Sequence, residues 1–143
     1  MKLLLTATTA TAIISTICLV APVKAENPAH VRQLLETNQC QKCDLKGADL
    51  SSAHLIGADL RDANLQQANL ANANLEGADL TGANLKQATL LNAFASDAIF
   101  NEANLTGVNF SSAKLYNADM DGAIVAGANF NNAKLYGADL SKF

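Results

Sequence analysis

The sequence predicts an all-β solenoid of square cross-section, with about five coils and a short helix over its N-terminal end. From residue 43 to residue 142 the chain divides without a gap into twenty units of five residues. Each unit has a central residue, which is Leu in fourteen units, and a small residue two positions earlier, which is Ala in eighteen. All eight glycines lie two positions after a centre.

A period of five residues fits neither the alternation of a simple β-strand nor the spacing of an amphipathic helix. The chain must therefore turn once in each unit, and the Gly, Asn, Asp and Ser residues found two positions after the centres are typical of tight turns. If each unit forms one side of a square, four units make one coil. Coils stacked about 4.8 Å apart can then pair through their backbones.

The central and small residues are expected to point inward and form the core. Because every fourth unit lies on the same side, the centres form four stacked columns. Ala95 is the one small centre, and the ring of Phe100 in the same coil can fill the space beside it. The columns are Leu45-Leu65-Leu85-Leu105-Val125, Leu50-Leu70-Leu90-Phe110-Phe130, Leu55-Leu75-Ala95-Leu115-Leu135 and Leu60-Leu80-Phe100-Met120-Leu140.

The position before each centre is Asp in six units and Asn in seven. Asn side chains in adjacent coils, such as Asn64, Asn84 and Asn104, can form hydrogen-bonded ladders. Alternatively, these side chains accept hydrogen bonds from the backbone of their own turn, which Asp and Asn commonly do. We favour the local bonds.

The units resemble the pentapeptide-repeat family, whose pattern is A(D/N)LXX, as in ADLRD, ANLEG, ADLTG and ANLKQ of this chain. The resemblance extends over residues 43–142, about 70% of the chain. It implies a right-handed quadrilateral β-helix. The handedness is implied by the resemblance, since the spacing of the residues does not define it.

Residues 1–25 are predicted to be a signal peptide that is removed on export. Lys2 supplies a positive start, a mainly apolar run continues to Val20, and Val23 to Ala25 offers a cleavage site. This predicts a periplasmic location, or the thylakoid lumen if the source is a cyanobacterium, with no stable membrane anchor after cleavage. A retained anchor is the alternative, but polar residues interrupt the run, which is close to the lower length limit for a span.

Residues 26–42 are expected to form a capping helix and the lead-in to a solenoid over residues 43–142. Asn27 followed by Pro28 is typical of a helix start, and the non-polar residues of the next turns share one face. An open solenoid end exposes unpaired strands and a non-polar layer. A helix over residues 28–37 would cover that layer.

Cys40 and Cys43 are predicted to form a structural disulfide or to be two packed thiols. Counting back in fives places Cys40 on a centre and Cys43 on a small-residue position, so both point into the first layer. A disulfide there would tie the cap to the solenoid. The CxxC spacing also occurs in redox proteins, which is an alternative although the βαβ context is missing. Zinc would need two further ligands, and nothing places His30 or His54 nearby.

The charge and motifs of the chain disfavour several functions. Without residues 1–25 the chain has 8 basic and 13 acidic residues, a net charge of −5, so no nucleic-acid partner is expected. No catalytic triad, phosphate loop or paired-acid cleft is visible, so we predict a non-enzyme without a cofactor. An outer column of Asp59, Asp79, Asp119 and Asp139 could hold a cation, but a solvated face is the simpler interpretation, and no metal site is predicted.

Seven residues depart from the usual pattern of the outer positions and are candidates for a partner-binding surface. They are Leu91, Phe94, Ile99, Lys114, Tyr116, Lys134 and Tyr136. On one side Phe94 is followed one coil on by Lys114 and two coils on by Lys134, with the tyrosines stacked beside them. The alternatives are that these are neutral variations of the repeat, or that Phe94 covers the weak layer at Ala95.

These features favour a non-catalytic structural or protein-interaction module that acts outside the cytoplasm and binds a protein partner or itself. The resemblance implies a second possibility, because some members of the family bind topoisomerases by imitating the shape and charge of DNA. The export signal and the two lysines on one face argue against that function. A CxxC redox protein is the third possibility.

Overall fold

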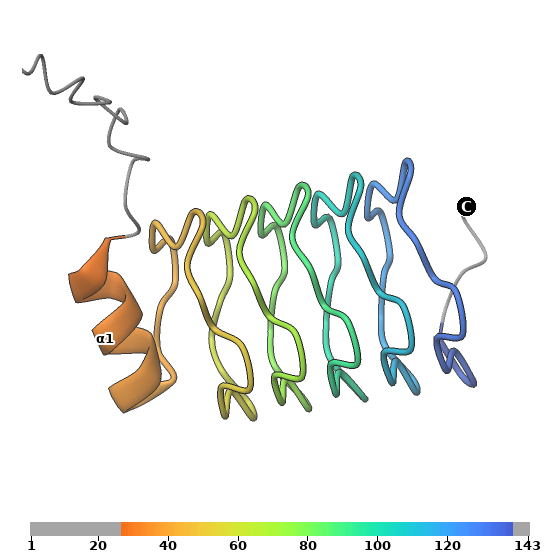
Figure 1. Ribbon diagram of the computed structural model, residues 1–143, viewed down its shortest axis with the longest axis horizontal. Coiled ribbons are helices and arrows are strands. Elements are labelled where there is room, and N and C mark those ends of the chain that lie inside the picture. Colours follow the sequence, from red (N-terminus) through yellow and green to blue (C-terminus); the bar gives the residue numbers. More distant parts are fainter. Residues whose placement is uncertain (1–26, 139–143) are drawn as a thin grey trace, which may run out of the picture.

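The computed structural model describes residues 27–138, which form a rod closed at one end by a helix. Figure 1 shows the helix α1, Pro28–Thr37, at the N-terminal end and the coils stacked along the long axis. The predicted signal peptide over 1–25 and residues 139–142 of the last predicted unit lie outside the described residues. No helix within 27–138 has the length and apolar character needed to cross a membrane.

Parallel backbone bridges join residues that are twenty positions apart, from Gln39 paired with Asp59 to Lys114 paired with Lys134. This spacing confirms that four units make one coil. The bridged residue is the one before each centre. Its backbone N–H donates to the preceding coil, as Asn64 donates to the Cys43 carbonyl at 2.8 Å, and the N–H of the centre donates to the following coil, as Leu65 donates to the Asn84 carbonyl at 2.8 Å. Each side of the square has only one bridged residue between two turns, so no longer strand develops in the described residues.

A tight turn forms every corner between Lys42 and Gly137. The backbone N–H of each small residue donates to the carbonyl of the preceding centre, as in Ala48 to Leu45 at 3.0 Å. The corner residue, two positions after the centre, has a positive φ in every turn. The value is 70° at Gly47 and 61° at Lys42, so glycine and other residues adopt the same conformation there. A positive φ at the third residue is the feature of a type II turn, which explains the glycines at this position.

The core contains the central and small residues, as predicted. Leu75 and most other centres from Cys40 to Met120 are fully buried, and Ala95 is buried as well. The rings of Phe100 and Phe110 meet edge to face with centroids 5.8 Å apart, and those of Phe110 and Phe130 stack at 5.1 Å. Aromatic centres from two columns therefore pack together in the second half of the rod.

The Asp and Asn residues before the centres mainly stabilise their own turns. The Oδ1 of Asn69 accepts the backbone N–H of Ala71 at 3.1 Å, and the same bond recurs along the rod. Ladder contacts also occur where an amide follows a carboxylate, since Asn64 donates to Asp44 and Asn69 donates to Asp49, both at 3.0 Å. The favoured local bonds are confirmed, and short ladders add to them at the N-terminal end.

Helix α1 covers the first coil as predicted for residues 28–37. The Asn27 side chain accepts the N–H groups of Ala29 and His30, Pro28 follows it, and Leu34 is fully buried against the coil. The solenoid pairing begins at Gln39, inside the segment predicted to be only a lead-in. Residues 38–42 form one more side because Cys40 takes the place of a centre and Lys42 makes the corner.

Candidate interaction surface

The candidate surface is the Phe94 column, which we define as Phe94, Lys114, Lys134, Tyr116 and Tyr136. The backbone bridges pair Phe94 with Lys114 and Lys114 with Lys134, so the three lie side by side in adjacent coils. Lys114 Nζ lies 4.5 Å from the centroid of the Phe94 ring, in cation–π geometry. The Phe94 side chain therefore lies on the outside of the rod, beneath Lys114, and is 42% exposed.

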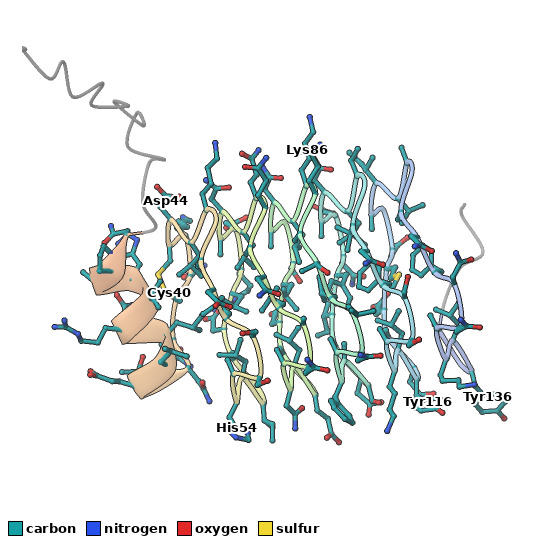
Figure 2. The ribbon with its side chains drawn as sticks, in the orientation of Figure 1. Cys40, Asp44, His54, Lys86, Tyr116 and Tyr136 are labelled. Carbon is teal, nitrogen blue, oxygen red and sulfur yellow. A yellow bond between two sulfur atoms is a disulfide. The ribbon has the colours of Figure 1, made fainter. Side chains whose placement is uncertain are left out.

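The two tyrosines flank the lysines at the position after the centre. The backbone of Tyr116 accepts the N–H of Asp97 at 2.8 Å, and that of Tyr136 accepts the N–H of Asn117 at 3.0 Å, which aligns the two tyrosines along the rod. Their exposed fractions are 37% for Tyr116 and 85% for Tyr136. Figure 2 shows both on the same edge of the rod. The Phe94 column thus presents three aromatic rings and two ammonium groups to solvent.

Leu91 and Ile99, the remaining candidates, lie in different surroundings. Leu91 is exposed at the corner before the Phe94 side, so it borders the Phe94 column. Ile99 is half-buried and bridged between Asp79 and Asp119 on the following side. The structure therefore does not place Ile99 in the Phe94 column.

Two further residues of the same edge were missed in the sequence. His54 heads the outer column that continues through Asn74 to Phe94, and Ile56 is 54% exposed at the position that Tyr116 and Tyr136 occupy in later coils. Figure 2 places His54 on the edge that also carries the two tyrosines. A non-polar residue directly after a centre was the available signal, since the same rule selected Leu91.

A disulfide links Cys40 and Cys43 across the first corner of the solenoid. Both residues are buried beneath α1, and Cys40 Sγ lies 3.3 Å from the carbonyl oxygen of His30 on that helix. The Nδ1 of His30 accepts the backbone N–H of Asp44 at 2.9 Å, directly after the second cysteine. The helix must move before a reductant can reach these sulfur atoms.

The carboxylates of Asp59, Asp79 and Asp119 accept hydrogen bonds from nearby side chains, and Asp139 lies outside the described residues. Arg61 contacts both oxygens of Asp59, at 2.8 and 2.5 Å, and its Nε lies 3.8 Å from Asp79 Oδ2. The hydrogen bonds from the Arg61 side chain lower the pKa of Asp59 below its usual value. Asn101 donates to Asp119 at 2.9 Å. Within residues 27–138 no three His, Cys, Asp or Glu side chains are grouped as a metal site requires.

Comparisons with known proteins agree with this repeat structure. The family model "Pentapeptide repeats (8 copies)" matches residues 43–82, 78–115 and 113–142. No curated protein matches the chain in sequence.

Several solved structures are similar to this one. A pentapeptide repeat protein from Nostoc PCC 7120 is 31% identical with a TM-score of 0.62, and the match covers 73% of this chain and 94% of that chain. Rfr23, a pentapeptide repeat protein from Cyanothece 51142, is 28% identical with a TM-score of 0.52, and the match covers 78% of this chain and 92% of that chain. A pentapeptide repeat protein from the Arabidopsis thaliana thylakoid lumen is 33% identical with a TM-score of 0.44, and the match covers 71% of this chain and 65% of that chain.

The family match extends over most of the chain, and the twenty-residue bridge spacing shows its structural basis. The similar pentapeptide repeat structures imply that the coils form a right-handed quadrilateral β-helix. The chain belongs to the pentapeptide-repeat family.

Proposed function

We propose that this protein is a non-catalytic interaction solenoid that acts outside the cytoplasm and binds a protein partner through the Phe94 column. The observation that carries the proposal is the exposure of three aromatic side chains in line with two lysines on a rigid backbone. Aromatic residues are enriched in protein interfaces, where they bury much area at a small entropic cost. Pentapeptide-repeat proteins are generally non-enzymatic interaction solenoids, which supports the same assignment.

The partner expected here is a protein that presents carboxylates beside a non-polar surface. Lys114 and Lys134 offer positive charge on a chain whose net charge is negative. A partner with the opposite pattern gains attraction at the lysines and buries the rings of Tyr116 and Tyr136. A second copy of this acidic chain is the other occupant to be tested.

The proposal is tested with a triple variant, Phe94→Asn with Tyr116→Ser and Tyr136→Ser. These residues are exposed, so the variant should keep the thermal unfolding transition of the parent. It should lose the crosslinked partner that the parent captures in its own compartment, or lose self-association in sedimentation. A control variant, Leu35→Ser with Ile124→Asn, removes non-polar groups of similar exposure elsewhere and should retain binding.

A position-specific crosslinker sharpens this test. A photoreactive phenylalanine analogue at Tyr136 should form an adduct with the partner, whereas the analogue at the exposed Ala126, which continues the Lys86 column on the opposite edge of the rod, should not. Adducts of equal yield at both positions, or an unchanged partner in the triple variant, would exclude the Phe94 column as the binding surface.

The location outside the cytoplasm rests on the sequence of residues 1–25. Export places the mature protein in the periplasm, or in the thylakoid lumen of a cyanobacterium, and allows the Cys40–Cys43 disulfide to persist. Cell fractionation with N-terminal sequencing of the mature chain tests this part. An intact N-terminus in the cytoplasmic fraction would contradict it.

The two alternatives have less support. A DNA-mimicking surface needs dense negative charge along the rod, whereas Lys114 and Lys134 occupy adjacent coils of one side. A redox function needs accessible cysteines, whereas Cys40 and Cys43 are buried under α1.

A further inference from the structure

A shallow depression lies on a different part of the surface from the Phe94 column. Its volume is about 130 Å³, and it is lined by Lys46, Gln66, Gln67, Lys86 and Gln87. Figure 2 shows Lys86 on the edge of the rod opposite to His54, Tyr116 and Tyr136. The three lining residues that directly follow a centre, Lys46, Gln66 and Lys86, come from successive coils, so one glutamine lies between two lysines.

The two lysines have no acidic partner. Within residues 27–138 the ion pairs involve Arg61, and neither Lys46 nor Lys86 takes part in one. The carboxylate of Asp44, on the same side of the coil, accepts the Asn64 amide at 3.0 Å and the backbone N–H of Lys46 at 3.4 Å. The depression therefore carries two ammonium groups that form no ion pair, while the neighbouring Asp44 carboxylate is engaged by neutral donors.

The glutamines supply hydrogen-bond donors beside these charges. Gln67 Nε2 donates to Gln87 Oε1 at 3.3 Å, which aligns the two amides along the rod and leaves both hydrogens of the Gln87 Nε2 for another acceptor. Gly47 and Gly107 occupy the corresponding corners of the coils before and after. The amide pair thus forms one wall of the depression, with no side chain beyond either end.

We propose that this depression binds a doubly charged phosphate group, as free phosphate or as a phosphate monoester. Two ammonium groups match the charge of the dianion, lysine is a common phosphate ligand, and the amide hydrogens can donate to the phosphate oxygens. Because the lysines are exposed, water and salt screen the attraction, so affinity is in the millimolar range and falls as salt rises. The site does not depend on the proposed partner, because it uses a different edge.

The test is a titration of the isotope-labelled full chain with sodium phosphate, followed through backbone and glutamine side-chain amide signals. Sodium chloride at matched ionic strength is the reference. The signals of Lys46, Gln66, Gln67, Lys86 and Gln87 should shift in a saturable manner with phosphate and not with chloride. Parallel titrations with glycerol phosphate and with sulfate distinguish a monoester and a general dianion from free phosphate.

A matched pair of double variants decides the location. Lys46→Gln with Lys86→Gln should weaken phosphate binding about tenfold or more, since each charge contributes severalfold even when exposed. Lys114→Gln with Lys134→Gln makes the same change of net charge at the Phe94 column and should bind phosphate as the parent does. Equal weakening in both variants, or shifts that chloride reproduces, would show that only the net charge matters and would overturn the proposal.

Discussion

The first and the last described coils of the rod follow the same five-residue pattern but differ in burial. Leu45 and Leu50, near α1, are almost completely buried, whereas Val125, Phe130 and Leu135 in the last described coil are only partly buried. The first coil has a helix on one side and a coil on the other. A five-residue unit cannot bury its own central side chain, so the burial of that side chain depends on the neighbouring coil or helix.

The largest effect is expected from a charge placed inside the stack. Leu75→Asp puts an unpaired carboxylate between two fully packed coils, which should cost several kcal/mol and unfold the rod. Circular dichroism during heating measures this, and Leu91→Asp, at an exposed corner, is the tolerated control. If Leu75→Asp melts like the parent, the inward assignment of the centres is wrong.

A smaller and more direct comparison uses one column of the core. Leu75 and Leu135 occupy the same column, but Leu75 is fully buried and Leu135 is only partly buried. Leu75→Ala should destabilise the protein by about 3 kcal/mol and Leu135→Ala by less than half as much, because less non-polar contact is lost. Chemical denaturation gives both values, and equal losses would contradict the effect of the neighbouring layer.

The disulfide is expected to stabilise the capped end. Replacing both Cys40 and Cys43 by Ala opens a loop of only a few residues, so the loss of free energy should be about 2 kcal/mol. The variant should unfold at a lower temperature, with earlier hydrogen exchange in α1 and residues 38–47 than in the remaining coils. A disulfide reductase activity that disappears in this variant would instead support a redox function.

The corners should behave alike at both ends, because a turn is local. Gly57 and Gly127 have φ values of 62° and 69°, and an added Cβ at either position meets no atom within 4 Å. Gly57→Ala and Gly127→Ala should each cost about 1 kcal/mol, from the strain of a positive φ alone. A clearly smaller cost at Gly127 would mean that the last described coil relaxes when its corner is strained.

The smallest effect is expected from the ion pair on the surface. The lowered pKa of Asp59 means that its bond to Arg61 stabilises the fold above the unfolded pKa of about 3.9 and is lost as the pH falls through the lower folded value. Because the Arg61 side chain is exposed to solvent, which screens the ion pair, the contribution to stability is small. The difference in Tm between the parent and Asp59→Asn should therefore be small at pH 6 and should shrink further as the pH falls below about 3.9.

Most of the fold could be predicted because the information is local and repeated. The small residue, the centre and the corner residue define where the chain turns and which side chains point inward, and the α1 boundaries follow from Asn27 and Pro28. The outer columns, such as the one that places Phe94 beside Lys114, follow from counting along the sequence in steps of twenty residues, which is one coil. The side formed by residues 38–42 has Asn38 where the repeat has a small residue, so the predicted solenoid begins at residue 43, although counting back in fives already places Cys40 on a centre.

The sequence by itself therefore determined the period, the corners, the core columns and the outer columns of this protein. Only the tertiary structure decided which rotamer an outer side chain adopts among neighbours one coil away, as in Lys114 over Phe94 and Gln67 bonded to Gln87. It also decided that Leu135 is less buried than Leu75. The physical reason is that a turn depends on four consecutive residues, whereas contact and burial depend on residues twenty positions apart and on the layer beyond.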